Sequence, residues 1–145
     1  MKLPKELYNG VIIFTGIALY FVLMEVLHLS NQVFLRLFNI VFIYYGVNKT
    51  LKSNFIEGKT DFAENAISAL LTALTGVLLS IMGLVAYIYS KGGDAYIRTL
   101  SESLLFVGSP SVMTYNISLL FEGIVSAVIV TFSLMLYWKK KYPSD

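Results

Sequence analysis

Four long apolar runs, separated by shorter polar stretches, dominate the pattern of the chain. A helix of roughly 20 residues crosses the hydrocarbon core of a membrane, and three of the runs reach that length unaided. Arg36 and Asn39 interrupt the second run, which crosses only if the arginine side chain snorkels to the interface or meets a counter-charge. We predict an all-α polytopic membrane protein, an antiparallel four-transmembrane-helix bundle with spans at about residues 8–29, 31–48, 62–90 and 114–138.

The connections between these spans differ in kind. Residues 30–32 form a tight turn, which makes the first two spans antiparallel neighbours. Residues 48–60 form a polar, basic loop, and Asp61 and Glu64 have the spacing of a capping box that begins the third span. In residues 94–107, apolar and charged positions fall on opposite faces of a helix. This pattern predicts a short amphipathic surface helix between the third and fourth spans.

Most of the basic residues lie on one predicted side of the membrane. If the second run spans, the lysines of the 48–60 loop share a side with both termini. Eight of the eleven Lys and Arg residues then lie on that side: Lys2, Lys5, Lys49, Lys52, Lys59, Lys139, Lys140 and Lys141. Because basic residues are enriched in cytoplasmic loops, we predict a multi-pass protein of the cytoplasmic membrane with both termini in the cytoplasm.

Composition supports a membrane protein and excludes several function classes. Hydrophobic residues make up 57% of the chain and charged residues 14%, whereas roughly 25% of residues are charged in soluble domains. We therefore expect one membrane domain over residues 1–145. The lack of cysteine and the single histidine exclude thiol chemistry, iron–sulfur clusters, Cys-ligated zinc and bis-histidine haem. The net charge of +2 reflects the topology, so we expect no nucleic-acid partner and no cofactor.

The third predicted span carries a stripe of small residues, called the small-residue seam below. Its members recur at alternating spacings of three and four: Ala66, Ala69, Ala73, Gly76, Ser80 and Gly83. In lipid, helices pack where small side chains let their backbones approach. The fourth span has a weaker stripe of Gly123, Ser126, Val130 and Ser133. We expect the two stripes to pack against each other within one chain. The alternatives are contact between copies of the chain and a substrate path.

Four ionisable residues fall within or beside the predicted spans at outer-leaflet depth: Glu25, His28, Arg36 and Glu122. A charge at the bilayer centre costs at least about 2.5 kcal/mol, so each residue needs a reason to be there. We predict one charge layer in which Arg36 pairs with Glu25 or Glu122 and fixes helix register, with His28 at the wet interface. The alternative is that an unpaired carboxylate, above all Glu122, binds a proton or cation during transport.

Three short motifs in the chain resemble a known family. They are Ile43-Tyr44-Tyr45-Gly46, the stretch from Gly58 to Ala66, and the closing Trp138-Lys139-Lys140-Lys141. The pattern resembles a family of small four-helix bacterial membrane proteins described as a domain of unknown function. The resemblance implies a four-helix protein of the bacterial cytoplasmic membrane with no established activity.

The sequence contains none of the common catalytic motifs: no phosphate-binding Walker loop, nucleophile elbow, metalloprotease helix or dinucleotide fingerprint. We therefore expect a protein that is not an enzyme, namely an accessory or scaffold subunit that acts through helix packing. Its expected partners are the lipid bilayer and a larger membrane complex or further copies of the chain. The alternative is an oligomeric proton- or ion-coupled transporter or channel that uses the layer of Glu25, Arg36 and Glu122.

Overall fold

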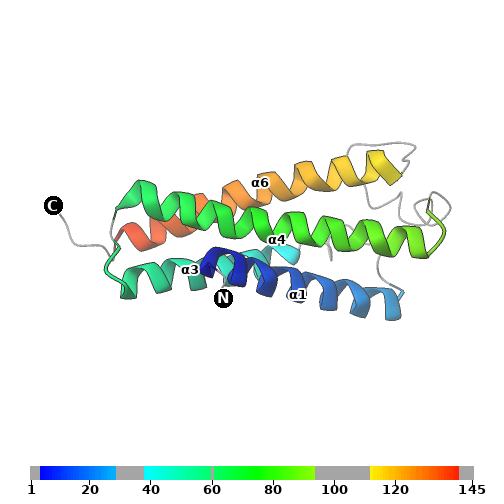
Figure 1. The fold of residues 1–145 in the computed structure, drawn as a ribbon, viewed down its shortest axis with the longest axis horizontal. Helices are drawn as coiled ribbons and strands as arrows, with labels where there is room; N and C mark the ends of the chain where they lie inside the picture. Colours follow the sequence, from blue (N-terminus) through cyan, green and yellow to red (C-terminus); the bar gives the residue numbers. More distant parts are fainter. Residues whose placement is uncertain (1–3, 29–37, 60, 94–111, 141–145) are drawn as a thin grey trace.

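The computed structural model describes residues 4–28, 38–59, 61–93 and 112–140 (Figure 1). These residues form four helices and no strand: α1 (Lys5–Val26), α3 (Asn39–Ile56), α4 (Phe62–Ser90) and α6 (Val112–Lys139). The all-α prediction is confirmed for the described part of the chain. Within these ranges, three helices are long and apolar enough to cross a membrane, namely α1, α4 and the Asn116–Lys139 part of α6. The helix α3 does not belong to that set.

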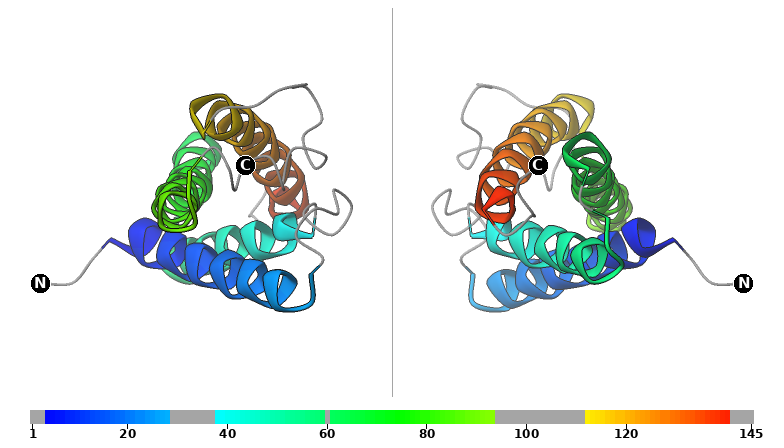
Figure 2. Two further views of the ribbon diagram at one scale, coloured as in Figure 1. Left: turned by 90° about the vertical axis from the view of Figure 1, so that its right-hand side faces the viewer. Right: turned by 90° about the vertical axis from the view of Figure 1, so that its left-hand side faces the viewer.

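Neighbouring helices alternate in direction along the chain. The helices α1 and α4 run parallel, since Glu6 bonds to Ser68 near their starts and Tyr87 bonds to Glu25 near their ends. The helix α3 runs against both, and α6 runs against α4 (Figure 1). Viewed along the long axis, α4 and α6 form two sides of a triangle, and α1 and α3 together form the third (Figure 2). The end where α3 stops and α4 begins is called the α3–α4 end below.

The observed helix boundaries agree with three predictions and contradict one. The predicted span at 62–90 matches α4, and the spans at 8–29 and 114–138 match α1 and α6 to within three residues. The second helix, however, runs to residue 56 rather than 48, so the loop expected at 48–60 is wrong over 48–56, whereas the predicted start at 31 lies outside the described residues. The polar residues of this segment fit a helix because they fall on two faces. Thr50 and Asn54, one turn apart, are both buried, whereas Lys49 and Lys52 are exposed. The predicted turn at 30–32 and surface helix at 94–107 lie outside the described residues.

Local interactions explain where α4 begins and where it ends. Asp61 has an extended backbone (φ −68°, ψ 126°), and its carboxylate accepts a 2.9 Å hydrogen bond from the Glu64 backbone N–H. This bond confirms Asp61 as the N-cap. At the other end, Gly92 and Gly93 have φ angles of 111° and 64°, which glycine adopts without steric cost. The Gly93 N–H then bonds back to the Ile88 carbonyl at 2.9 Å and ends the helix.

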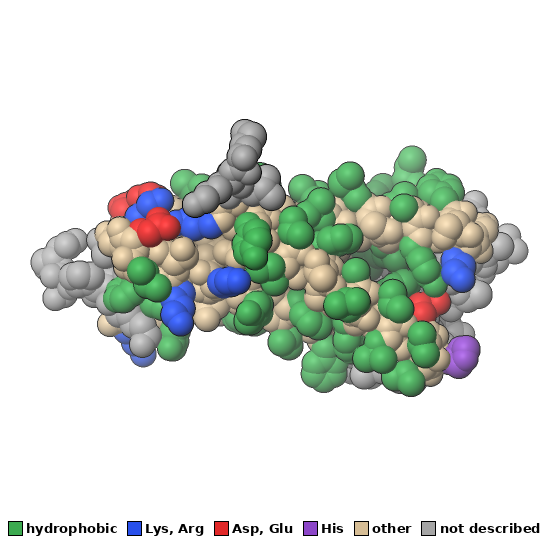
Figure 3. Space-filling view, turned by 60° about the horizontal axis from the view of Figure 1, so that its bottom comes forward, with side chains coloured by type: hydrophobic (Ala, Val, Ile, Leu, Met, Phe, Trp, Pro, Cys, Tyr) green, Lys and Arg blue, Asp and Glu red, His purple; other side chains and the backbone are tan. Residues whose placement is uncertain are grey.

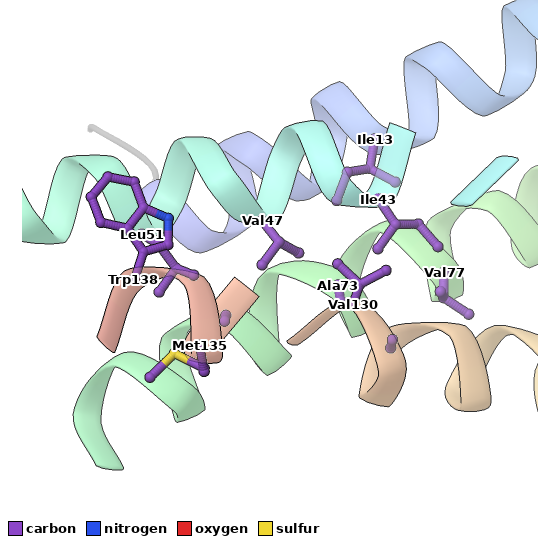
Figure 4. Close-up of a cluster of buried hydrophobic side chains, with 11 residues drawn as sticks. Ile13, Ile43, Val47, Leu51, Ala73, Val77, Val130, Met135 and Trp138 are labelled. Carbon is purple, nitrogen blue, oxygen red and sulfur yellow. The ribbon is translucent and has the colours of Figure 1, made fainter. Parts of the chain in front are cut away.

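The centre of the apolar core is Ile13, which is fully buried between α3 and α4. A Cβ built on Gly76 would lie 2.5 Å from Ile13 Cγ2, and a Cβ on Gly46 would also overlap the Ile13 side chain. The two glycines therefore make the space that Ile13 fills. Around it, Ile43 and Val47 of α3 point toward α4 and α6 (Figure 4). On the far side of α4, Val77 fills the corresponding space over Gly123 of α6.

The surface is apolar over most of its length. Large hydrophobic side chains are exposed on all four helices, and only 22–28% of the most apolar 18-residue window of each of the three candidate spans is buried. Charged side chains gather mainly toward the α3–α4 end, while hydrophobic side chains cover the middle of the face shown in Figure 3. Such a distribution is typical of a protein whose middle faces lipid.

Candidate functional site

The predicted charge layer is only partly within the described residues. Glu25 is half-buried between α1 and α4, where its Oε2 accepts a 3.1 Å hydrogen bond from the Tyr87 hydroxyl. The Tyr87 ring in turn packs edge-on against Phe21, with ring centroids 5.3 Å apart. Arg36 lies outside the described residues, so its pairing with Glu25 or Glu122 remains a prediction.

His28 lies just beyond the end of α1 and is exposed. Its φ of 58° is the left-handed conformation, and its backbone N–H donates to the Glu25 carbonyl at 3.1 Å. The His28 backbone is therefore the left-handed residue that follows the last turn of α1.

The backbone of Glu122 lies at a different level along α4 from that of Glu25. The residue is half-buried on α6, and its neighbour Gly123 packs against Val77 of α4. Tyr87, which binds Glu25, lies ten residues beyond Val77, and ten residues of helix span roughly 15 Å. The structure thus does not bring the backbones of the two glutamates into one layer.

The small-residue seam is packed within the chain, and part of it contacts α1 rather than α6. Ala69 and Ala73 are fully buried, and Ala66 packs against the same core. Gly76 lies against Ile13, and a Cβ on Gly83 would lie 2.9 Å from the Phe14 ring.

Ser80 donates its hydroxyl proton to the Gly76 carbonyl at 2.7 Å. Of the weaker stripe on α6, Gly123 contacts Val77, beside the seam rather than on it, and Val130 is fully buried. Ser126 is half-buried and Ser133 is exposed. These two serines of the stripe are therefore not enclosed by the described part of the chain.

A buried polar network joins α1, α3 and α4, and sequence reasoning missed it. Asn9 Nδ2 donates to Thr50 Oγ1 at 2.8 Å, and Thr72 Oγ1 donates to the Ser68 carbonyl at 2.9 Å. Because the single proton of Thr72 is used in that bond, Thr50 is the donor in the 2.8 Å contact between the two threonine hydroxyls. A directed chain of hydrogen bonds thus crosses from α1 through α3 to α4.

A second branch of the network lies one turn closer to the α3–α4 end. Asn65 Nδ2 donates to the carbonyls of Lys59 and Asp61, at 3.0 and 2.9 Å. Its Oδ1 therefore faces Asn54, whose Nδ2 donates to it at 2.9 Å. Ser68 adds a 2.6 Å bond to the Glu6 carboxylate of α1. We call these residues the polar junction: Glu6, Asn9, Thr50, Asn54, Asn65, Ser68 and Thr72.

The sequence did contain a signal for the polar junction. Asn65, Ser68 and Thr72 recur at helical spacing beside the small-residue seam, and Thr50 and Asn54 are one turn apart. Two polar residues at helical spacing that follow an apolar run indicate a buried polar face only if the helix continues. The assignment of 48–60 to a loop concealed the pattern.

Ion pairs at the α3–α4 end lie outside this buried region. Lys5 Nζ is 2.7 Å from Glu57 Oε2, and Lys59 Nζ is 3.6 Å from the same oxygen and 3.8 Å from Glu64. The hydrogen bond from Lys5 holds the pKa of the Glu57 carboxyl below its usual value. Desolvation works to lower the pKa of Lys59, but the carboxylates of Glu57 and Glu64 outweigh it, so that pKa is raised. The pairs tie the start of α1 to the α3–α4 connection.

The chemistry of the polar junction is that of neutral hydroxyl and amide groups, with one half-buried carboxylate. Such groups orient helices and bind other neutral hydrogen-bonding groups. Within the described ranges, no group of three or more His, Asp or Glu side chains is placed to hold a metal ion. Comparison of the chain with protein-family models, curated proteins and solved structures finds no match.

Proposed function

We propose that this chain is a multi-pass protein of the cytoplasmic membrane that serves as a noncatalytic scaffold or accessory subunit. The proposal rests on where the polar and small residues make their contacts. The polar junction and most of the small-residue seam make their contacts inside the chain, whereas α6 keeps Ser126 half-buried and Ser133 exposed. A rigid unit with one such unfilled stripe suits the docking of another transmembrane helix.

The proposed topology has α3 as the fourth crossing. Its 18 residues span about 27 Å as a helix, close to the thickness of the hydrocarbon core. Its buried polar groups bond to α1 and α4 and not to lipid. Both termini and the α3–α4 connection then lie on the cytoplasmic side, with most of the lysines.

The outer face of α6 is the proposed contact for the partner. Around Ser133, the exposed side chains are large and apolar, among them Ile129, Phe132 and Leu136. A small residue among large ones lets a second helix approach at that point. The partner is accordingly a transmembrane helix with an apolar face, from another protein or from a second copy of this chain.

Purification in mild detergent from the native membrane tests this proposal. A fixed partner, or a second copy, should accompany the wild-type chain, and Ser133→Leu should release it because a bulky side chain holds the helices apart. Val128→Leu is the matched control, since Val128 is 53% exposed and lies five residues, about 140° around the helix, from Ser133. A wild-type chain that purifies as a lone monomer would contradict the scaffold function.

Transport remains a second candidate because Glu25, a half-buried carboxylate, bonds to Tyr87 between two helices. A carboxylate in such a place takes up and releases protons if water reaches it. Glu25→Gln and Glu122→Gln should then fold normally and abolish pH-dependent flux in reconstituted vesicles. A wild-type chain without flux excludes this candidate and leaves the scaffold function standing.

A further inference from the structure

Two side-chain oxygens in the polar junction are deeply buried and receive no hydrogen bond from the described part of the chain. Asn9 is 2% exposed and Asn54 is 1% exposed. No donor among the described residues reaches Asn9 Oδ1 or Asn54 Oδ1. Buried polar atoms are satisfied in folded proteins with few exceptions, and leaving one without a partner costs about 1–3 kcal/mol.

Reversing the amides does not remove this deficit. The Asn54 side chain must present its NH₂ to Asn65, because Asn65 Nδ2 is fixed by two backbone carbonyls. For Asn9, a reversed amide would accept from Thr50, and Thr72 would then have to donate to Thr50 rather than to the Ser68 carbonyl. That arrangement only replaces an unpaired oxygen by an unpaired NH₂ group. The deficit therefore belongs to the packing of the three helices.

The two oxygens lie at neighbouring positions of the polar junction. Asn9 bonds to Thr50, and Asn54 follows Thr50 by one turn on the same face of α3. Since Cβ atoms four residues apart on a helix are about 6 Å apart, Asn9, through Thr50, and Asn54 meet neighbouring positions on one face of α3. A water that donates two hydrogen bonds of about 2.8 Å each, at its near-tetrahedral angle, bridges acceptors about 4.5 Å apart.

We propose that the polar junction binds an internal water molecule, which donates one hydrogen bond to Asn9 Oδ1 and one to Asn54 Oδ1. A water supplies two donors for two acceptors, and buried waters typically bridge otherwise unsatisfied polar groups. The acceptors are neutral amides, and the Glu6 carboxylate is half-buried and accepts from Ser68. A desolvated cation needs its hydration shell replaced by a set of oxygens, so the chemistry favours water.

A structure of the full-length protein in lipid, at a resolution that shows ordered water, tests the site directly. We expect a density peak at about 2.8 Å from both Asn9 Oδ1 and Asn54 Oδ1. A junction without such a peak would overturn the proposal. A peak at the shorter distances typical of metal–oxygen coordination would also overturn it, because it would identify a cation.

A double-mutant cycle gives a second, independent test. Asn9→Ala and Asn54→Ala should each lower the melting temperature, and the double variant should lose less than the sum, because either change already removes the shared water. The control cycle combines Asn9→Ala with Asn48→Ala, since Asn48 Oδ1 has its own donor in Trp138 Nε1; these losses should add. Additive losses for Asn9 and Asn54 would contradict a bridge between them.

The same melting experiment separates water from a cation. Replacing Na⁺ and K⁺ with N-methylglucamine at constant ionic strength should leave the melting temperature of the wild type unchanged. A loss of stability that Na⁺ or K⁺ restores in the wild type, and not in Asn54→Ala, would overturn the water site in favour of a monovalent cation site.

Discussion

Ile13 fills the space that Gly46 and Gly76 leave open, so its contribution to stability depends on the absence of two other side chains. We expect Ile13→Ala to lower the free energy of unfolding by about 2–5 kcal/mol, through the cavity that it leaves. Gly46→Ala should cost about 1–3 kcal/mol because the new methyl group overlaps Ile13. Thermal unfolding in detergent measures both changes.

The two substitutions should compensate each other. In the double variant, the methyl group introduced by Gly46→Ala occupies part of the space that the shortened side chain at position 13 leaves, so the combined loss should be smaller than the sum. Leu19→Ala serves as the control, since Leu19 is 67% exposed on the same helix. Strict additivity of Ile13→Ala and Gly46→Ala would show that the two sites do not share this space.

His28 is the one described residue other than glycine with a left-handed backbone. We expect His28→Gly to raise the free energy of unfolding by roughly 0.5–1 kcal/mol, because glycine adopts this conformation without the Cβ penalty. His28→Val should lower it, because β-branched residues fit this region worst. Thermal unfolding of the three proteins checks the order Gly, His, Val, and the reverse order would contradict a backbone role.

At the level of elements, the ion pair between Lys5 and Glu57 connects the start of α1 to the residue that follows α3. The pKa of Glu57 in the folded protein lies below its ordinary value of 4.5. The pair therefore stabilises the fold above that ordinary value, and its contribution is lost as the pH falls through the lowered pKa. Because both groups are solvent-accessible, we expect a small effect.

Thermal unfolding between about pH 6 and about pH 3 measures this contribution. The wild type should lose more stability over this range than Glu57→Gln, which has no carboxylate to protonate. Lys5→Met should flatten the curve in the same way, since it removes the partner. If Lys5→Met kept the full pH dependence of the wild type, another group would be responsible for it.

The contrast between α4 and α3 shows what the sequence allowed us to predict. The helix α4 was predicted to the residue because its apolar length and the Asp61 cap indicate the same boundaries. The helix α3 was misplaced because its second half buries its polar face. Hydropathy assigns such a segment to a loop, whereas the contacts with Asn9 and Thr72 show where its polar groups lie.

The same contrast holds between the two parts of the candidate site, the small-residue seam and the charge layer. The seam could be predicted because small residues in an apolar run have few other uses. The charge layer assumed that depth follows from counting residues inward from each turn. The level of Glu122 depends instead on how α6 is shifted along α4, which the contact of Gly123 with Val77 sets. Relative shifts between distant helices are not encoded in the periodicity of either one.

At the level of the whole molecule, the topology can be tested with a single reactive residue, because the chain has no cysteine of its own. Lys52 and Lys140 are exposed toward the α3–α4 end, and Lys91 is exposed just after α4. With an impermeant thiol reagent on intact cells, Lys52→Cys and Lys140→Cys should be protected, and Lys91→Cys should be labelled. Labelling of the first two but not of the third would invert the proposed orientation.

The hydrogen bond from Ser68 to Glu6 also constrains how the protein is made. The two residues are 62 positions apart, and at roughly 5–20 residues per second a ribosome needs about 3–12 s to cover that interval. During this time, α1 has been synthesised while Ser68, its polar partner on α4, has not. The polar junction therefore cannot be completed before Thr72 has been synthesised. A nascent chain stopped before Thr72 has its first helix complete but lacks the full set of bonds that holds it.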